Sequence, residues 1–198
     1  MNKEIRVLDF KNQSEDDLVI EGYAATFNQP TILYKIDGIE YKEVIAHGAF
    51  DEADMKDCCL KYNHSSGVPI LARTRGGSLQ LRTDDIGLFF RGNVFPTQTG
   101  KDVHMLVKGG ALDKASFAFT IADGGDEYDR STRTRTIKKV EKLWDVAIVD
   151  IPAYDSTSVY ARSFFEAEAE KERREQADAA RRAELKAELK RKVGINGN

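Results

Sequence analysis

A sharp change in composition near Arg162 limits where a folded core can form in this chain. Between residues 166 and 192 the sequence holds 8 acidic and 9 basic residues, many alanines, and no glycine or proline. This composition favours a helix, and charge pairs four residues apart, such as Glu170 and Arg174, support it modestly. Because such a helix is polar on almost every side, it has no wide apolar face to bury. We therefore predict a globular domain over residues 1–161 and a charged helical arm over residues 162–198.

Before this break, apolar residues come in short runs separated by turn-forming residues, which is typical of β-strands. The pair Asp37-Gly38 suits the tight turn of a hairpin, because both residues tolerate positive φ. A helix is predicted to start at Thr99 or Gly100 and to end at Gly109-Gly110. About seven strands with one or two helices indicate an α+β fold with an antiparallel sheet or barrel. The predicted strands lie within residues 17–27, 34–45 (a hairpin), 78–82, 87–95, 115–121 and 144–151.

Charge and cysteine content argue against several classes of function. The 198-residue chain has a formal net charge of -3, so no overall positive field attracts nucleic acid or an anionic membrane. The sequence shows neither a signal-peptide pattern nor an apolar run of about 18 residues, and we expect a cytosolic protein. Cys58 and Cys59, the only cysteines, are adjacent, which suits neither a disulfide framework nor a zinc site that includes His64. We expect both cysteines to be buried and to pack as small hydrophobic residues. The sequence also has no glycine-rich phosphate loop, so we predict neither a metal nor a cofactor.

Histidine is the side chain best suited to act as a base near neutral pH, and the chain has three: His47, His64 and His104. His64 follows the apolar run Cys58-Cys59-Leu60, at the point where a predicted strand meets a turn. The strand would hold its backbone while the ring stays accessible. Taken alone, the position of His64 fits a loop residue without a catalytic role better than a catalytic base.

Ser116 and Asp145 are the other candidates. In the strand at residues 115–121, Ser116, Ala118 and Thr120 alternate with aromatic residues, so one face is small and polar, as the floor of a substrate groove should be. Asp145 opens an apolar strand, where a carboxylate needs a partner, and orienting a histidine would provide one. A serine on a half-exposed strand and a strand-end salt bridge remain alternative interpretations, and Glu141 and Asp150 are competing acids.

Several segments, taken together and in order, resemble the prohead (procapsid maturation) serine proteases of tailed bacteriophages. The resemblance runs from about residue 20 to residue 162 and includes a Gly-Ala-Phe, an Asn-His, a Ser-Phe-x-Phe and a Pro-Ala-Tyr motif. The matching segments are EGYAATF (21–27), EVIAHGAF (43–50), YNH (62–64), ILART (70–74), GGALDKASFAF (109–119) and LWDVAIVDIPAY (143–154).

The resemblance implies a fold and a set of catalytic residues. The fold would be a closed, mostly antiparallel β-barrel flanked by helices, related to the herpesvirus assembly proteases. Ser116 would be the nucleophile, His64 the base and Asp145 the third member, where many relatives carry Glu. His104 is the counterpart of the second histidine of the herpesvirus enzymes, but it precedes the serine on a predicted helix and is discounted. His47 stands where the family usually has proline and is given no role.

The resemblance also implies a substrate and a place of action. The substrates would be scaffold, the scaffolding segment of the major capsid protein, and the protease itself. Copies of the chain would then associate with each other. Cleavage would take place inside the procapsid, in the host cytoplasm. The arm at residues 162–198 would dock on scaffold helices and be removed by self-cleavage, or serve as a solubilising tail. The alternative to a serine endopeptidase is a non-enzymatic internal scaffold protein that retains the protease fold.

Overall fold

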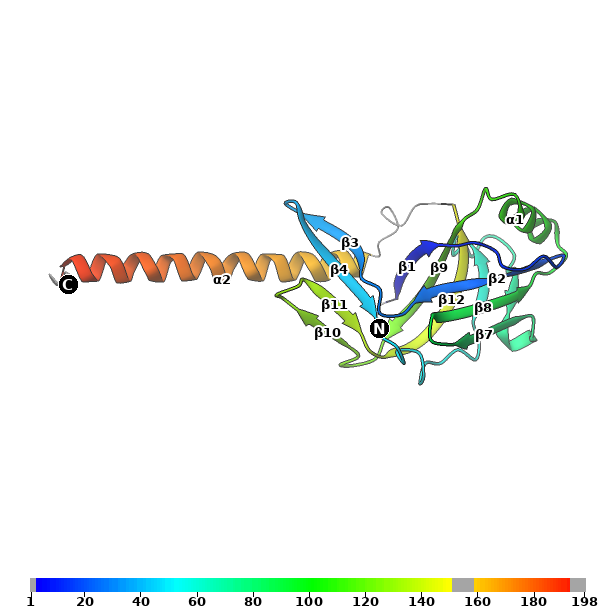
Figure 1. Cartoon of the computed structure of the whole chain (residues 1–198), viewed down its shortest axis with the longest axis horizontal. Helices are drawn as coiled ribbons and strands as arrows, with labels where there is room; N and C mark the ends of the chain where they lie inside the picture. Colours follow the sequence, from blue (N-terminus) through cyan, green and yellow to red (C-terminus); the bar gives the residue numbers. More distant parts are fainter. Residues whose placement is uncertain (1–2, 151–158, 193–198) are drawn as a thin grey trace. The chain divides into compact units, whose positions relative to one another are not determined.

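The computed structural model describes residues 3–150 and 159–192 and divides into two compact units, Met1–Ala161 and Arg162–Asn198 (Figure 1). The described residues contain twelve strands, arranged in three sheets, and the two α-helices α1 (Gln98–Lys108) and α2 (Val159–Lys192). This arrangement confirms the α+β class. The Pro152-Ala153-Tyr154 motif and Ile151, the last residue of the predicted strand 144–151, lie outside the described residues.

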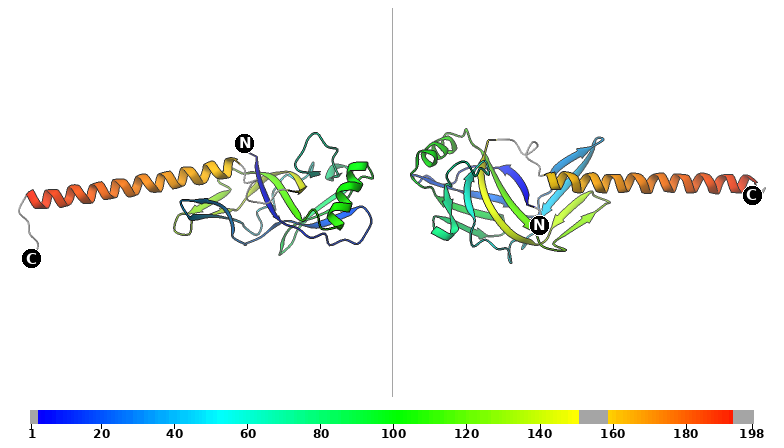
Figure 2. Two further views of the ribbon diagram at one scale, coloured as in Figure 1. Left: turned by 90° about the horizontal axis from the view of Figure 1, so that it is seen from above. Right: turned by 180° about the vertical axis from the view of Figure 1, so that it is seen from behind.

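A five-stranded sheet forms the centre of the first unit, with the strand order β1-β9-β12-β5-β6. β12 pairs antiparallel with β9 on one side and parallel with β5 on the other. Figure 2 shows β9 and β12 side by side along their length. The strands are β1 (Glu4–Asp9), β5 (Cys59–Tyr62), β6 (Ala72–Arg73), β9 (Lys114–Ile121) and β12 (Val140–Val149).

Two smaller sheets complete this unit. A four-stranded sheet has the order β10-β11-β4-β3, and a three-stranded sheet has the order β2-β8-β7. A short 3-10 helix, η1 (Thr74–Gly76), precedes β7. The strands are β2 (Val19–Thr26), β3 (Thr31–Ile36), β4 (Ile39–Ile45), β7 (Leu79–Thr83), β8 (Gly87–Asn93), β10 (Asp126–Asp129) and β11 (Thr134–Ile137).

The closed barrel expected from the resemblance is not found in the part of the chain that the structure describes, where all three sheets are open. β1 and β6 form the edges of the five-stranded sheet and do not pair with each other. Tight turns instead pair strands that are consecutive in the chain, β3 with β4 and β7 with β8. The predicted hairpin turn is confirmed, with φ of 51° at Asp37 and 80° at Gly38. Both hairpins lie in the smaller sheets, so neither joins β1 to β6 and the five-stranded sheet stays open at these two edges.

β5 corresponds to the strand expected before His64, and four further strands, β1, β6, β10 and β11, lie outside the strands predicted from the sequence. In β1 (EIRVLD) the first four residues alternate between charged and apolar, but the charged ones are buried and Ile5 between them is only partly buried. Glu4 and Arg6 are both buried, and Arg6 is paired with the buried Glu43. From the sequence alone, a charged side chain is expected to be exposed. Its burial can be predicted only together with its ion-pair partner, and here that partner is distant in the chain.

The hydrophobic core lies between the sheets and beneath α1. Aromatic side chains dominate it, and Phe117 and Phe119 of β9 stack with ring centroids 5.0 Å apart. The helix α1 begins slightly before the predicted start at Thr99 or Gly100, because the Thr97 side chain accepts a hydrogen bond from the Gly100 amide over 3.0 Å. This capping contact satisfies an otherwise unpaired N–H of the first turn.

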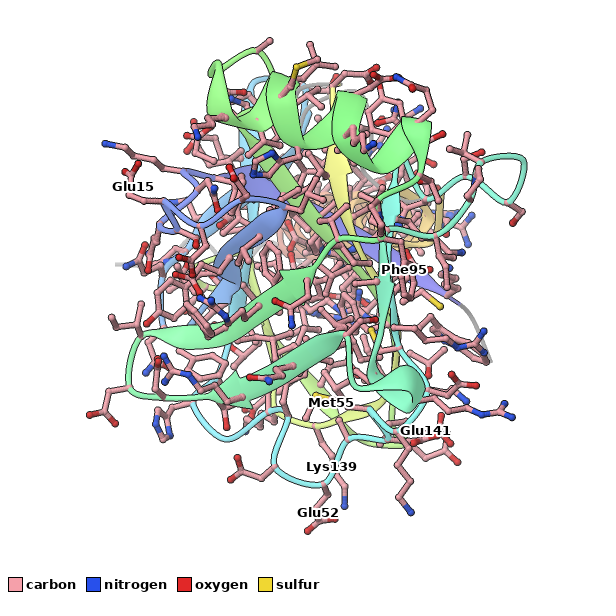
Figure 3. The ribbon with its side chains drawn as sticks, turned by 90° about the vertical axis from the view of Figure 1, so that its right-hand side faces the viewer. Glu15, Glu52, Met55, Phe95, Lys139 and Glu141 are labelled. Carbon is pink, nitrogen blue, oxygen red and sulfur yellow. The ribbon has the colours of Figure 1, made fainter. Side chains whose placement is uncertain are left out.

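The loop between β4 and β5 runs beside the start of β12. The Asp54 amide donates to the Glu141 carbonyl over 2.8 Å, and the Leu143 amide donates to the Asp54 carbonyl over 3.0 Å. At the surface, Glu52 and Lys139 form an ion pair of 2.6 Å, and Figure 3 shows their side chains next to each other. These contacts fix the beginning of the strand that carries Asp145.

Replacing Gly87 with alanine is expected to destabilise the first unit. A Cβ at this position would lie 1.9 Å from the Ala25 carbonyl oxygen of β2, so β2 and β8 would have to move apart. We expect the free energy of unfolding to fall by about 1–3 kcal/mol, the usual range for overpacking. Urea unfolding measures it, with Gly76→Ala as the control because an added Cβ there has nothing within 4 Å. Equal midpoints for the two variants would contradict the prediction.

Candidate active site

Three segments far apart in the sequence bring Ser116, His64 and Asp145 together. Ser116 lies in β9 and Asp145 in β12, and in the pairing of these strands Ala147 stands opposite Ser116. β5 lies on the other side of β12, with Cys59 opposite Asp145, and His64 follows two residues after its end. Because paired residues of neighbouring strands share a face of the sheet, β12 places the serine, the carboxylate and the end of β5 on the same side.

The side chains form a continuous hydrogen-bonded series. His64 Nε2 lies 2.7 Å from Ser116 Oγ, and His64 Nδ1 is hydrogen-bonded to Asp145 Oδ1. Ser116 and Asp145 are buried, whereas 14% of the His64 side chain is exposed. The three residues predicted from the sequence are therefore in direct contact, with the histidine between the serine and the carboxylate.

The backbone at His64 has an unusual conformation. Asn63 and His64 have φ of 52° and 53°, in the left-handed region that residues other than glycine rarely occupy. The turn is held to the end of β12, because the Asn63 amide donates to the Ile148 carbonyl over 2.9 Å and Asn63 Oδ1 accepts from the Asp150 amide over 3.2 Å. Strained backbone of this kind persists where the surroundings enforce it, often at functional sites.

Asp145 is surrounded by positive charge. Its second oxygen, Oδ2, accepts a hydrogen bond from Lys3 Nζ over 2.8 Å, and Lys61 Nζ lies 3.7 Å from the same oxygen. Burial by itself raises the pKa of Asp145, but the hydrogen bonds from His64 and Lys3 outweigh it and lower the pKa below its ordinary value. The carboxylate is therefore ionised at neutral pH and able to hold the imidazole ring.

The competing acids occupy other positions. Asp150 is exposed, and its carboxylate accepts a hydrogen bond from the Tyr62 hydroxyl over 2.7 Å. Glu141 lies near the start of β12, four residues before Asp145, where its backbone carbonyl binds the Asp54 amide. In the described residues the carboxylate bound to His64 belongs to Asp145.

The strand that carries Ser116 alternates as predicted, but its polar face is not an open groove floor. Phe117 and Phe119 belong to the core, and Ser116 and Thr120 on the opposite face are buried as well. Ser116 Oγ also lies 2.7 Å from the carbonyl oxygen of Arg6 in β1. The expectation of an open groove on this face of β9 was wrong. The composition of the face suggests exposure, but neighbouring strands and their side chains cover it.

The remaining histidines and the cysteines do not join this set. His104 is buried on α1, and His47 is exposed with Nε2 3.7 Å from an Asp85 carboxylate oxygen. Cys58 is buried in the core as predicted, whereas Cys59 is partly exposed. Burial raises the pKa of the Cys58 thiol to about 12, which disfavours the thiolate that a metal would need. Both ring nitrogens of His64 are already engaged, so these residues fit a zinc site poorly.

Three contacts of the site were not predicted from the sequence: the ammonium groups of Lys3 and Lys61 and the backbone carbonyl of Arg6. No sequence pattern marks Lys3, because its role depends on β1 lying beside β9. Lys61 could have been found, since it lies two residues after Cys59 in the strand that leads to His64. Side chains two residues apart in a strand share a face.

Comparison with known proteins gives one match. A family model described as caudovirus prohead serine protease matches residues 4–172, which is most of the chain. No match was found among curated proteins or among solved structures. Within the described residues, no helix is both long and apolar enough to span a membrane.

The lowered pKa of Asp145 predicts a specific acid sensitivity. Because its folded-state pKa lies below the ordinary value of 3.8, the carboxylate stabilises the fold above that pH. This contribution is lost as the pH falls from about 3.8 through the folded-state pKa. We expect urea unfolding between pH 5 and pH 2.5 to show a steeper loss of stability for the wild type than for Asp145→Asn. Asp85→Asn, which removes a fully exposed carboxylate, is the control, and parallel curves for the wild type and Asp145→Asn would contradict the prediction.

Proposed function

Because the chain belongs to the caudovirus prohead serine protease family, we propose that it is a serine endopeptidase with Ser116 as nucleophile, His64 as general base and Asp145 as the residue that orients the histidine. The observation that carries the proposal is the hydrogen-bonded series, with His64 Nε2 2.7 Å from Ser116 Oγ and His64 Nδ1 bonded to Asp145. This order of groups is the one that nucleophilic catalysis by serine requires.

In the proposed mechanism, Ser116 Oγ attacks the carbonyl carbon of a peptide bond while its proton passes to His64 Nε2. The carboxylate of Asp145 stabilises the imidazolium ion and keeps the proton-bearing Nδ1 directed toward Oδ1. His64 then gives the proton to the leaving amine, and an acyl-enzyme remains on Ser116. Water attacks this ester with His64 again as base, which releases the carboxylic acid product and restores the serine hydroxyl.

The family supports a role in capsid maturation, and the substrates that we propose fit this role. We place the enzyme inside the procapsid, where it cleaves scaffold, the scaffolding segment of the major capsid protein and its own chain. Cleavage of one copy by another would bring copies of the chain into contact. The formal net charge of -3 is consistent with protein substrates rather than nucleic acid.

A non-enzymatic internal scaffold protein is the second candidate function. The observation that favours it is the burial of Ser116, whose hydroxyl has no exposed surface for a substrate carbonyl to approach. In this alternative the fold is retained for assembly and the buried residues serve only stability. Activity measured for the serine variant distinguishes the two functions.

Ser116→Ala is expected to abolish cleavage while leaving the fold intact. Without the hydroxyl no acyl-enzyme forms, and removal of a triad member lowers kcat by several orders of magnitude, roughly 10⁶-fold. The wild type and the variant are each co-expressed with the cognate capsid protein, and the intact masses of both products are measured. We expect shortened capsid protein and a shortened chain only with the wild type.

Ser131→Ala, in the turn between β10 and β11, is the matched control and should cleave as the wild type does. Cleavage that persists in Ser116→Ala would exclude this nucleophile. Shells that assemble and mature normally with Ser116→Ala would favour the scaffold function.

We propose that α2 docks the protease on scaffold helices. Its polar surface carries ion pairs one turn apart, with Glu170 to Arg174 and Glu188 to Lys192 both at 2.8 Å. Leu185 and Leu189 are 51% and 61% exposed, and their spacing of four residues puts them on one side of the helix. An exposed apolar pair between charged neighbours is the pattern of a helix that packs on another helix.

Replacing both leucines with glutamate is expected to reduce incorporation of the protease into procapsids. The matched control is the double variant Ala183→Glu with Ala187→Glu, which adds the same charge on the opposite side of α2 at the same spacing. The amount of protease in purified procapsids, relative to capsid protein, is measured by quantitative mass spectrometry. Equal incorporation of a chain that ends at Glu172, which keeps the span matched by the family, would contradict docking by the arm.

A further inference from the structure

The strand β1 and the residue before it contact two of the three residues of the candidate active site. Lys3, which directly precedes β1, donates a hydrogen bond from Nζ to Asp145 Oδ2 over 2.8 Å. The Arg6 carbonyl oxygen in β1 lies 2.7 Å from Ser116 Oγ. β1 pairs with β9 so that Val7 stands opposite Ser116, which keeps the backbone of β1 against the serine.

The Ser116 hydroxyl has one proton and two acceptors within reach. His64 Nε2 and the Arg6 carbonyl oxygen are both 2.7 Å from Oγ, so the proton points to one or the other. When it points to His64, the hydroxyl is ready to be deprotonated. When it points to Arg6, His64 Nε2 must itself donate to Oγ, and a nitrogen that already carries a proton cannot act as a base.

The orientation and charge of Asp145 select between these two states. An ionised carboxylate accepts a hydrogen bond from Nδ1–H of His64 at its Oδ1 atom, which keeps the ring proton on Nδ1. In a neutral ring Nε2 then has no proton and accepts a hydrogen bond from Ser116. If the carboxylate rotates away or is protonated, the tautomer with its proton on Nε2 becomes favourable. The serine proton then turns to the Arg6 carbonyl, and the nucleophile is inactive.

We propose that Lys3 is a positioning residue that acts through Asp145 to keep Ser116 hydrogen-bonded to His64 rather than to Arg6. This inference rests on the proposed serine protease function. The ammonium group of Lys3 occupies Oδ2, which leaves Oδ1 for the histidine and favours the ionised carboxylate. Lys61 contributes positive charge at 3.7 Å but no hydrogen bond of normal length to the same oxygen.

Buried ion pairs fix the position of β1 and therefore of Lys3. Arg6 binds Glu43 of β4 twice, with Nε to Oε1 at 2.5 Å and Nη2 to Oε2 at 2.6 Å. Glu4 accepts a hydrogen bond from Arg135 of β11 over 3.0 Å. Two-point pairing of arginine with carboxylate is directional, so these contacts hold β1 to the four-stranded sheet in one register.

The test compares Lys3→Met and Lys3→Arg with the wild type, using the full chain and a C-terminal purification tag. A fluorophosphonate probe reacts with an activated serine, and its rate of labelling is measured between pH 5 and pH 9. For Lys3→Met we expect a rate roughly 5-fold lower at neutral pH, since one end of the ion pair is solvent-exposed. The acid side of the rate profile should move to higher pH, because loss of the Lys3 ammonium group removes one of the contacts that lower the pKa of Asp145.

Lys3→Arg should restore both the rate and the profile, since guanidinium also donates to a carboxylate. Lys35→Met is the matched control, because it removes a lysine from an exposed pair with Glu40 of similar length, 3.0 Å. A purely structural role of Lys3 would lower the melting temperature without moving the pH profile, and that result would overturn the inference.

A spectroscopic measurement makes the test independent of reactivity. The proton between His64 Nδ1 and Asp145 should give a far-downfield proton NMR signal in the wild type and in Lys3→Arg, and it should weaken or move upfield in Lys3→Met. An identical signal in Lys3→Met would overturn the inference. The proposed function fails separately, if the wild type is labelled no faster than Ser116→Ala.

Discussion

The position of β12 between β9 and β5 is the constraint on which the candidate site depends. Its antiparallel partner supplies Ser116 and its parallel partner leads to His64, while β12 itself carries Asp145. Residues separated by 52 and 81 positions in the chain are thus aligned by backbone hydrogen bonds rather than by the side chains themselves. A shift of one residue in either pairing would turn the side chains of that strand to the other face and separate the three groups.

Much of this arrangement could be predicted because it is encoded locally. Runs of β-forming residues between turn residues predicted most strands. The alternation around Ser116 predicted that Phe117 and Phe119 share the other face of the strand, and in the structure this face packs in the core. The composition near Arg162 predicted α2, since helix propensity is a property of short segments. The choice of Ser116, His64 and Asp145 came from family motifs, and the geometry brings all three into contact.

The parts that could not be predicted depend on long-range pairing. β1 was missed because Glu4 and Arg6 look exposed in the sequence and become buried only through Glu43 and Arg135. The expected barrel was wrong because hydrogen-bonding edges are decided by competition among all strands of the fold. Local sequence patterns do not reveal which strand edges remain unpaired. The contact between Lys3 and Asp145 could not be predicted either, because it depends on the pairing of β1 with β9.

The buried ion pairs of β1 are better explained by position than by stability. Removing charged groups from water is costly, and a well-packed apolar cluster of the same size is often as stable as a buried ion pair. Apolar contacts, however, tolerate sliding along a strand, whereas the two-point pairing of Arg6 with Glu43 fixes one register. A slip of β1 along β9 would remove Lys3 from Asp145 and the Arg6 carbonyl from Ser116 together. The charges buried between the two sheets therefore set the hydrogen bonds of the serine on the other face of the central sheet.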